Sequence, residues 1–387
     1  MKYNFDEIIN RKGTCSYKWD SSEKDVLPLW VADMDFRTAQ PVIDALQKQV
    51  SHGIFGYTHV PESYYEAVTG WFARRHGWKI EREHIIYTSG VVPALSAIIK
   101  AMTEPGDKVL VQGPVYNCFF SSIRNNKCEI VSNSLIYKDL TYTMDFADLE
   151  RKLSDPKVKI MLLCNPHNPA GRVWTREELL KVGELCERYG VQVVSDEIHC
   201  ELVYKGSEYI PFASLFPDAI ACVSATKTFN IAGLQIANIV CRDASIRARI
   251  DRAINDNEVC DVNPFGVIAT LAAYNEGEEW LSQLLSYLYD NYSFMQKFCA
   301  EHLPGFPLTK LEGTYLVWMD CRKLGMKSDE LEERLKEETS LWLNAGTMYG
   351  PEGEGFMRWN IACPRVRLQN ALTRFENFVL KSSFMLK

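Results

Sequence analysis

The sequence predicts an α/β fold in which a large, doubly wound and mostly parallel sheet domain is joined by a smaller α+β domain built from both chain ends. Short β-rich runs alternate with helical patterns between about residues 84 and 240, as in repeated strand–helix–strand units. These runs are apolar throughout, which is typical of parallel strands that helices cover on both faces. Towards the C-terminus the order changes, because long helices there flank only two strand-like runs.

The predicted elements follow in chain order. The strands of the large domain are expected at 84–88, 108–112, 159–164, 191–196, 219–224 and 237–241. The later pattern predicts a helix over 281–303, a strand over 311–320, a helix over 328–338, a strand over 355–362 and a closing helix. We therefore expect an N-terminal segment (1–46) that joins the small domain, a large domain over 47–285 and a C-terminal small domain over 286–387.

The composition excludes several classes of protein. Hydrophobic residues make up 47% and charged residues 24% of the 387 residues, which is the balance of a folded globular protein rather than a disordered or fibrous one. The net charge is -7 and no basic stretch gathers on one predicted helix face, so we expect no nucleic acid as a partner. The longest apolar runs fall short of the roughly 18 residues that a membrane span needs, and the N-terminus has no apolar segment like that of a signal peptide.

The 12 cysteines form no CxxC pair, and several lie in apolar runs. Cysteine in such a setting behaves as a small hydrophobic residue, and a chain of this length builds a core without disulfides. We therefore expect reduced, buried thiols and a cytoplasmic protein. The seven histidines are not spaced as metal ligands with a cysteine or with one another, so we expect no metal site.

Polar residues follow each predicted strand, and sheets of this kind bind ligands beyond the carboxyl ends of their strands. The run SGVVPAL (89–95) is a Ser-Gly turn that leads into a helix, so its backbone N–H groups suit a phosphate. Taken alone, this run is explained more simply as a plain strand–turn–helix connection.

Asp196 ends one apolar run, and Lys227 lies just past the next one. A carboxylate at that edge of the sheet is partly desolvated and needs a cation or a hydrogen-bond donor. The two side chains form either a structural ion pair or two parts of an aldehyde cofactor's site. In the second case the lysine amine would form a Schiff base and the carboxylate would hold a pyridinium nitrogen.

The loop after the third strand, NPHNPAG (165–171), favours the cofactor site. Its prolines fix the turn, and Asn168 can present an amide to a ligand oxygen. A structural turn would need neither the second Asn-Pro step nor polar partners after the adjacent strands. Tyr116, in the loop after the second strand, could stack on a flat ring or pack as an ordinary core aromatic.

Together, the runs SGVVPAL, GPVY, NPHNPAG, SDEIH and SATKTFNIAG resemble the fold type I pyridoxal-phosphate enzymes of the aminotransferase class I/II superfamily. The segments LPLWVADMDF (27–36) and GYTHVPESYYEAV (56–68) are similar to those of the MalY/PatB-type cystathionine β-lyases, also called C–S lyases. The resemblance covers essentially the whole chain, with the motifs in the same order and at the same spacing. It implies the fold type I architecture and the cofactor pyridoxal 5'-phosphate.

The resemblance also implies roles for individual residues. The catalytic residues it implies are Lys227 as the Schiff-base lysine, Asp196 as the partner of the pyridinium nitrogen and Tyr116 as the residue stacked on the ring. The other cofactor-binding residues it implies are Gly90, Val91, Val92, Asn168, His199, Ser224, Thr226 and Tyr57, of which the last would reach the phosphate of a neighbouring subunit. The substrate-binding residues it implies are Arg358, Tyr57 and Trp30.

Arg358 would clamp the α-carboxylate of the substrate, a task that suits a planar, bidentate guanidinium. Without the resemblance, a surface ion pair is the simpler expectation for an arginine in that strand. Two positions depart from the transaminase pattern: His199 stands where those enzymes commonly carry a tyrosine, and Gln235 where they commonly carry an arginine. Both departures match the C–S lyase branch.

The function implied is β-elimination from L-cystathionine, L-cysteine or related S-substituted cysteines, which yields pyruvate, ammonia and a thiol or hydrogen sulfide. A homodimer with shared active sites is implied as well. An aminotransferase on the same scaffold remains an alternative. So does a cofactor-binding regulatory protein that acts by protein–protein contact, although no patch in the sequence identifies such a surface.

Overall fold

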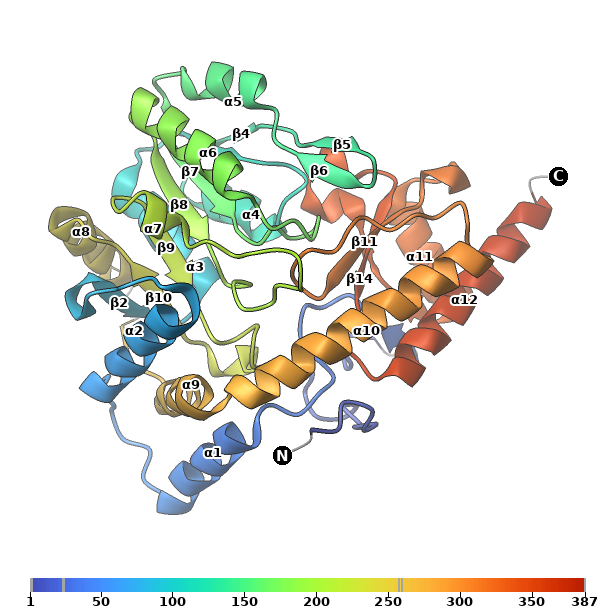
Figure 1. Cartoon of the computed structure of the whole chain (residues 1–387), viewed down its shortest axis with the longest axis horizontal. Coiled ribbons are helices and arrows are strands. Elements are labelled where there is room, and N and C mark those ends of the chain that lie inside the picture. The colour runs from blue at the N-terminus through green and yellow to red at the C-terminus, as the bar shows by residue number, and fades with distance from the viewer. Residues whose placement is uncertain (1–2, 23–24, 257, 259, 386–387) are drawn as a thin grey trace.

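The computed structural model describes residues 3–22, 25–256, 258 and 260–385, and its central element is a seven-stranded sheet (Figure 1). The strand order in this sheet is β2-β10-β9-β8-β7-β3-β4. The strands are β2 (Ile85–Thr88), β3 (Lys108–Val111), β4 (Glu129–Ser132), β7 (Val158–Cys164), β8 (Gln192–Asp196), β9 (Ile220–Val223) and β10 (Ala237–Val240). The five strands from β4 to β9 run parallel, so their carboxyl ends meet at one edge.

The six predicted strands of this sheet are confirmed to within one residue at each end. The parallel direction is wrong for β10, which pairs antiparallel with both β9 and β2. An apolar run shows that a strand is covered on both faces, but it does not encode the direction of the strand. The sequence also missed β4, an edge strand whose side chains are exposed or half-buried. The strand expected over 311–320 begins only at Leu316.

A smaller sheet has the order β11-β14-β13. Its strands are β11 (Leu316–Asp320), β13 (Asn344–Ala345) and β14 (Phe356–Asn360). The N-terminal part of the chain joins this region, because β1 (Leu27–Pro28) pairs in parallel with β12 (Leu341–Trp342). A separate hairpin consists of β5 (Ile136–Lys138) and β6 (Thr141–Thr143).

Helices cover both faces of the large sheet and connect it to the small one. Up to the last strand of the large sheet they are α1 (Gln40–His52), α2 (Glu62–His76), α3 (Val91–Met102), α4 (Asn117–Asn125), α5 (Phe146–Leu153), α6 (Arg176–Tyr189) and α7 (Phe212–Leu215). After it they are α8 (Ala244–Asn255), α9 (Pro264–Glu276), α10 (Glu278–His302), α11 (Ser328–Thr339) and α12 (Arg365–Met385). Figure 1 shows α10 as the long helix that runs from α9 to α12. No helix in the described ranges has both the length and the apolar character that a membrane crossing requires.

The core lies on both faces of the large sheet, and alternate strand residues point into its two halves. In β7, for example, Ile160 and Leu162 pack with α3, α4 and α8, whereas Met161 and Leu163 belong to the cluster on the other face. All 12 cysteines are free thiols and nine of them are buried, which agrees with the expectation that cysteine serves here as a packing residue.

Candidate active site

A cavity of about 530 Å³ lies at the carboxyl ends of the parallel strands, as expected for a sheet of this type. Residues from the ends of several strands line it, together with residues from the N-terminal segment and from β14. The predicted site residues that line it are Trp30, Gly90, Val91, Val92, Tyr116, Asn168, Asp196, His199, Thr226, Lys227 and Arg358. The fold therefore gathers most of the predicted site residues in one place.

Asp196 is the last residue of β8 and is 3% exposed. Its Oδ1 atom accepts a hydrogen bond of 3.1 Å from the backbone N–H of Ile198. Burial raises the pKa of the Asp196 carboxyl to about 7, and the neighbouring carboxylate of Glu197 contributes in the same direction. No ion pair joins Asp196 to Lys227 or to any other cation in the part of the chain that the structure describes. The structural ion pair considered as an alternative is therefore not formed.

Lys227 lies in the loop after β9, and its Nζ atom donates a hydrogen bond of 2.7 Å to the backbone carbonyl of Ala32. Burial and the charge of Arg358 together lower the pKa of the Lys227 amine to about 8, against the opposing charges of Asp33 and Asp196. A lysine with a lowered pKa in a cavity is typical of an amine that acts as a nucleophile or a base.

Arg358 lies in the middle of β14 and is 3% exposed. Its Nη1 donates to Asn168 Oδ1 at 3.1 Å, its Nη2 donates to the Trp30 carbonyl at 2.6 Å, and its Nε has no partner. No carboxylate pairs with it among the residues described. The surface ion pair is therefore wrong for this arginine, and the cavity holds a cation that is free to bind an anionic group.

Two further residues, Tyr116 and His199, line the cavity. Tyr116 caps the N-terminus of α4 and lines the cavity, and burial raises the pKa of its hydroxyl well above the ordinary value. Burial, with the positive charges of Lys227 and Arg358, lowers the pKa of His199 to about 3. Its ring is therefore neutral, and its buried Nδ1 has no hydrogen-bond partner.

The N-terminus of α3 forms one end of the cavity. Gly90 is its N-cap residue and provides no side-chain hydrogen bond, so the first N–H groups of the helix remain available for an anion. Thr226 and Gln235 line the same region. Ser224 does not line the cavity. Its hydroxyl donates to the Ile236 carbonyl at 2.6 Å and lies within hydrogen-bonding distance, 2.9 Å, of Thr226 Oγ1, so it helps to hold the Thr226 hydroxyl in place.

Tyr57 lies apart from the other predicted residues. It is fully exposed in the loop between α1 and α2 and does not line the cavity. Trp30 does line it, and its ring stacks on Trp342 with centroids 4.2 Å apart. Tyr17, which the sequence did not indicate, packs against Trp30 at 5.2 Å and also lines the cavity.

The sequence also missed the partners that hold the cavity's polar groups. The Ala32 carbonyl accepts from both Lys227 and the Tyr315 hydroxyl, the latter at 2.9 Å. Asn344 donates to the Trp30 carbonyl at 2.9 Å, beside Arg358. Tyr315 lies in the predicted strand over 311–320, but no predicted strand marked the position of Asn344, and a backbone carbonyl such as that of Ala32 gives no signal in the sequence.

The sequence of this chain is similar to a protein-family model and to known proteins over nearly its whole length. The family model "Aminotransferase class I and II" matches residues 24–375. The cystathionine β-lyase PatB of Bacillus subtilis (strain 168) is 45% identical over 382 residues, which cover 96% of this chain and 99% of that protein.

Solved structures give a similar result. Cystalysin from Treponema denticola, whose crystal structure contains pyridoxal 5'-phosphate, has a TM-score of 0.95 and 34% identity over 100% of both chains. The pyridoxal-phosphate-bound C–S lyase from Staphylococcus hominis has a TM-score of 0.91 and 32% identity, and the match covers 97% of this chain and 98% of that one.

Proposed function

Because the chain belongs to the aminotransferase class I and II family, we propose that it is a pyridoxal-phosphate-dependent carbon–sulfur β-lyase, as its relatives named cystathionine β-lyase and C–S lyase are. The observation that carries the proposal is the arrangement of three charged groups around one cavity. Asp196 and Arg358 are buried there and Lys227 is partly buried, and none of the three forms an ion pair among the described residues. Each of them matches a chemical need of an amino acid bound to this cofactor.

The residues present fit pyridoxal phosphate. A buried carboxylate without a cationic partner, such as Asp196, is what a pyridinium nitrogen needs beside it. The uncapped N-terminus of α3 and the Thr226 hydroxyl suit the phosphate. Asn168 would donate to the ring oxygen, and Tyr116 would stack on the ring. When bound, the cofactor supplies an aldehyde carbon for the amino group and a ring that accepts electrons from the substrate Cα.

The side chains of this protein would then divide the remaining tasks. Arg358 would hold the substrate α-carboxylate by its free N–H groups. Lys227 would take the proton from Cα, because a pKa of about 8 leaves part of its amine neutral near pH 7. Asp196 would keep a proton on the ring nitrogen, and His199 would stay neutral because its pKa is lowered to about 3.

The reaction is the elimination of a thiol from Cβ. An S-substituted L-cysteine and one water give a thiol, pyruvate and ammonia. L-Cystathionine would yield homocysteine, and L-cysteine would yield hydrogen sulfide. His199 and Gln235, which stand where transaminases commonly carry a tyrosine and an arginine, favour elimination over transamination.

We propose in addition that the protein is a homodimer. Tyr57 is 100% exposed, and Ile54 and Phe55 in the same loop are 68% and 59% exposed. A loop with this many exposed apolar side chains is typical of an interface. A second copy that covers it would bring Tyr57 to the phosphate end of its neighbour's cavity. A cytoplasmic location is proposed because a reducing compartment suits both the thiol products and the free cysteines.

The test is to incubate the purified protein with L-cystathionine and no keto acid, and to measure pyruvate and thiol. We expect both products in equal amounts, and a yellow protein that borohydride bleaches. The matched control is Lys227→Ala, which should stay folded and form no pyruvate. Product formation that requires an added keto acid would assign the protein to the transaminases instead, and turnover by Lys227→Ala beyond a trace would refute the role of the lysine.

A further inference from the structure

The segment 30–36, which carries the sequence WVADMDF, is held by side chains along its length. Each carbonyl from residue 30 to residue 34 accepts at least one side-chain hydrogen bond. The donors include two residues of β14, Arg358 and Asn360, and two residues of the loop after β9, Lys227 and Asn230. The segment is therefore a common contact of the small sheet and of the loop that carries the reactive lysine.

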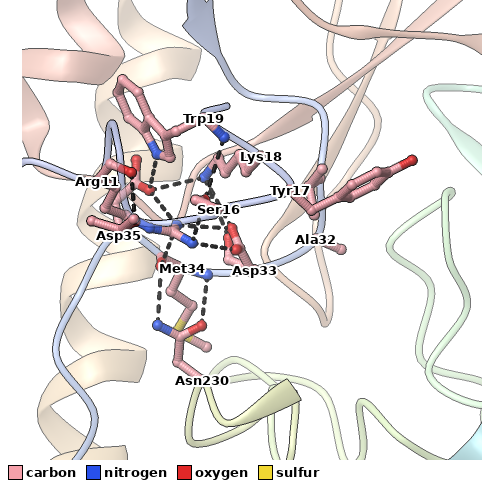
Figure 2. A network of polar contacts seen from close by, with 12 residues as sticks. Arg11, Ser16, Tyr17, Lys18, Trp19, Ala32, Asp33, Met34, Asp35 and Asn230 are labelled. Carbon is pink, nitrogen blue, oxygen red and sulfur yellow. Dashed lines mark hydrogen bonds and ion pairs between the residues drawn. The ribbon is translucent and has the colours of Figure 1, made fainter. Parts of the chain in front are cut away.

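A cluster of charges fixes this segment to the N-terminal residues (Figure 2). Arg11 forms a two-bond fork with Asp33, at 3.1 Å from Nη1 to Oδ1 and 2.6 Å from Nη2 to Oδ2, and its Nη1 also donates to Asp35 at 2.8 Å. The fully buried Lys18 ammonium lies 3.4 Å from Asp33 Oδ1 and 3.2 Å from Asp35 Oδ1. Arg367 contacts the other oxygen of Asp35 at 3.1 Å.

The two aspartates differ in what they face. Asp35 is 1% exposed at its side chain and is enclosed by three cations, so its charge is neutralised within the cluster. Asp33 is 20% exposed at its side chain, and among the residues that the structure describes its ion pairs are with Arg11 and Lys18. Its charge reaches Lys227, where it favours the protonated amine. Asp33 therefore lies at the end of the cluster that acts on the lysine.

The connection from the cluster to the lysine is short. Asp33 follows Ala32, whose carbonyl accepts the hydrogen bond from Lys227 Nζ. Asn230, three residues after Lys227, donates to the carbonyls of Met34 and Phe36 at 3.0 and 2.9 Å and accepts from the Met34 N–H at 2.9 Å. Figure 2 shows Asn230 directed at this segment from one side and the charge cluster from the other.

We propose that Asp33 is a positioning residue for Lys227: its fork with Arg11 fixes the 30–36 segment, so that the Ala32 carbonyl receives the lysine ammonium, and its charge favours that ammonium. The role of Asp33 rests on the proposed role of Lys227 as the base at Cα. After the amine has taken the proton, the Ala32 carbonyl is the acceptor that holds it, and Asp33 supplies the nearby negative charge.

The direction of the effect can be worked out from the groups that face Lys227. They are Arg358 on β14, Asp196 at the end of β8, Asp33, Cys118 on α4, and the neutral His199. Loss of the Asp33 charge leaves Arg358 less opposed, so the pKa of Lys227 falls below about 8. Arg358, Asn360 and Asn230 still hold the segment in such a variant, so we expect it to stay in place. A segment that opened to water would instead raise the pKa of Lys227 towards the ordinary lysine value of about 10.4. The two explanations therefore predict opposite signs.

The experiment measures how fast Lys227 reacts with an amine-specific acylating reagent in the full-length, cofactor-free chain, as a function of pH. The labelled peptide is quantified by mass spectrometry. In Asp33→Asn we expect the midpoint to fall by about half a pH unit or more, which corresponds to a roughly threefold faster reaction near pH 7. Asp33→Glu keeps the charge and should restore the midpoint most of the way.

The matched control is Glu7→Gln, which removes one negative charge from the exposed ion pair with Arg37 in the same N-terminal part of the chain. It should leave the midpoint unchanged. If Asp33→Asn does not fold, the double variant Arg11→Gln/Asp33→Asn leaves no unpaired guanidinium and should show a smaller fall, because the lost Arg11 charge offsets part of the lost Asp33 charge but is not among the main influences on Lys227. An unchanged or raised midpoint in the folded Asp33 variant overturns the proposal. Because labelling needs neither cofactor nor substrate, this outcome is independent of whether pyruvate is formed from cystathionine.

Discussion

Replacing Asp196 with asparagine removes a buried carboxyl group whose pKa the protein raises from 3.8 to about 7. Between these two values the folded, cofactor-free chain binds one more proton than the unfolded chain does. Its free energy of unfolding therefore falls as the pH rises. The contribution is fully present below about pH 4 and is lost once the pH has passed about 7.

The magnitude follows from the difference between the two pKa values. One pKa unit corresponds to ~1.4 kcal/mol, so the whole effect amounts to roughly 4 kcal/mol. About 2 kcal/mol of this falls between pH 5.5 and pH 7, where the protein can be measured without strong acid. Asparagine has a similar shape and no charge, so the variant lacks this part of the pH dependence.

The assay is equilibrium unfolding by urea of the cofactor-free chain at pH 5.5 and at pH 8, with wild type and Asp196→Asn compared at each pH. We expect the variant to be more stable than the wild type at pH 8, by about 2 kcal/mol more than at pH 5.5. Asp218→Asn, at an exposed position, is the control and should follow the wild type. Asp196→Asn should also lower β-lyase turnover by several orders of magnitude, since an amide cannot hold a pyridinium charge. Equal pH dependence in Asp196→Asn and wild type would refute the reasoning.

Two further predictions concern the substrate clamp and the thiols. Arg358→Lys keeps the charge but loses the planar fork of the guanidinium. We therefore expect the KM for L-cystathionine to rise by roughly tenfold or more, which corresponds to at least ~1.4 kcal/mol. Steady-state kinetics measure this change, and an unchanged KM would contradict the role of Arg358 in holding the substrate carboxylate. Only Cys15 and Cys260 are exposed, so a thiol reagent should label these two rapidly in the native chain and the nine buried cysteines only after denaturation; rapid labelling of Cys164 or Cys222 contradicts the packing described here.

The elements of the large sheet were predictable because buried strands leave a direct mark in the sequence. Runs such as 159–164 are apolar on both faces, and the structure buries both. An apolar run says nothing about the direction of its strand, which is why the antiparallel pairing of β10 was not predicted. It also fades at an edge, where β4 begins with the exposed Glu129 and meets no requirement for continuous apolar character.

The site was predictable wherever a side chain carries the chemistry. Asp196 and Lys227 could be named because a carboxylate and an amine just after neighbouring strands suggest specific tasks, whereas Arg358, in the middle of a strand, was named from the family resemblance. Tyr57 is exposed and lies outside the cavity of its own chain; in the proposed dimer it would reach the cavity of the second copy, which a single chain does not contain. Ala32 could not be found at all, since its contribution is a backbone carbonyl and every residue has one.

The 30–36 segment explains how a backbone carbonyl nevertheless constrains the sequence. The carbonyls of this segment need no particular side chain, but they must stay where donors from β14 and from the lysine loop can both reach them. The requirement therefore passes to neighbouring residues: Asp33 and Asp35, whose charges hold Arg11 and Lys18, and Asn230, whose amide bonds the segment on its other side. A chemical task at the carbonyl of Ala32 thus appears in the sequence as acidic residues one and three positions later, Asp33 and Asp35.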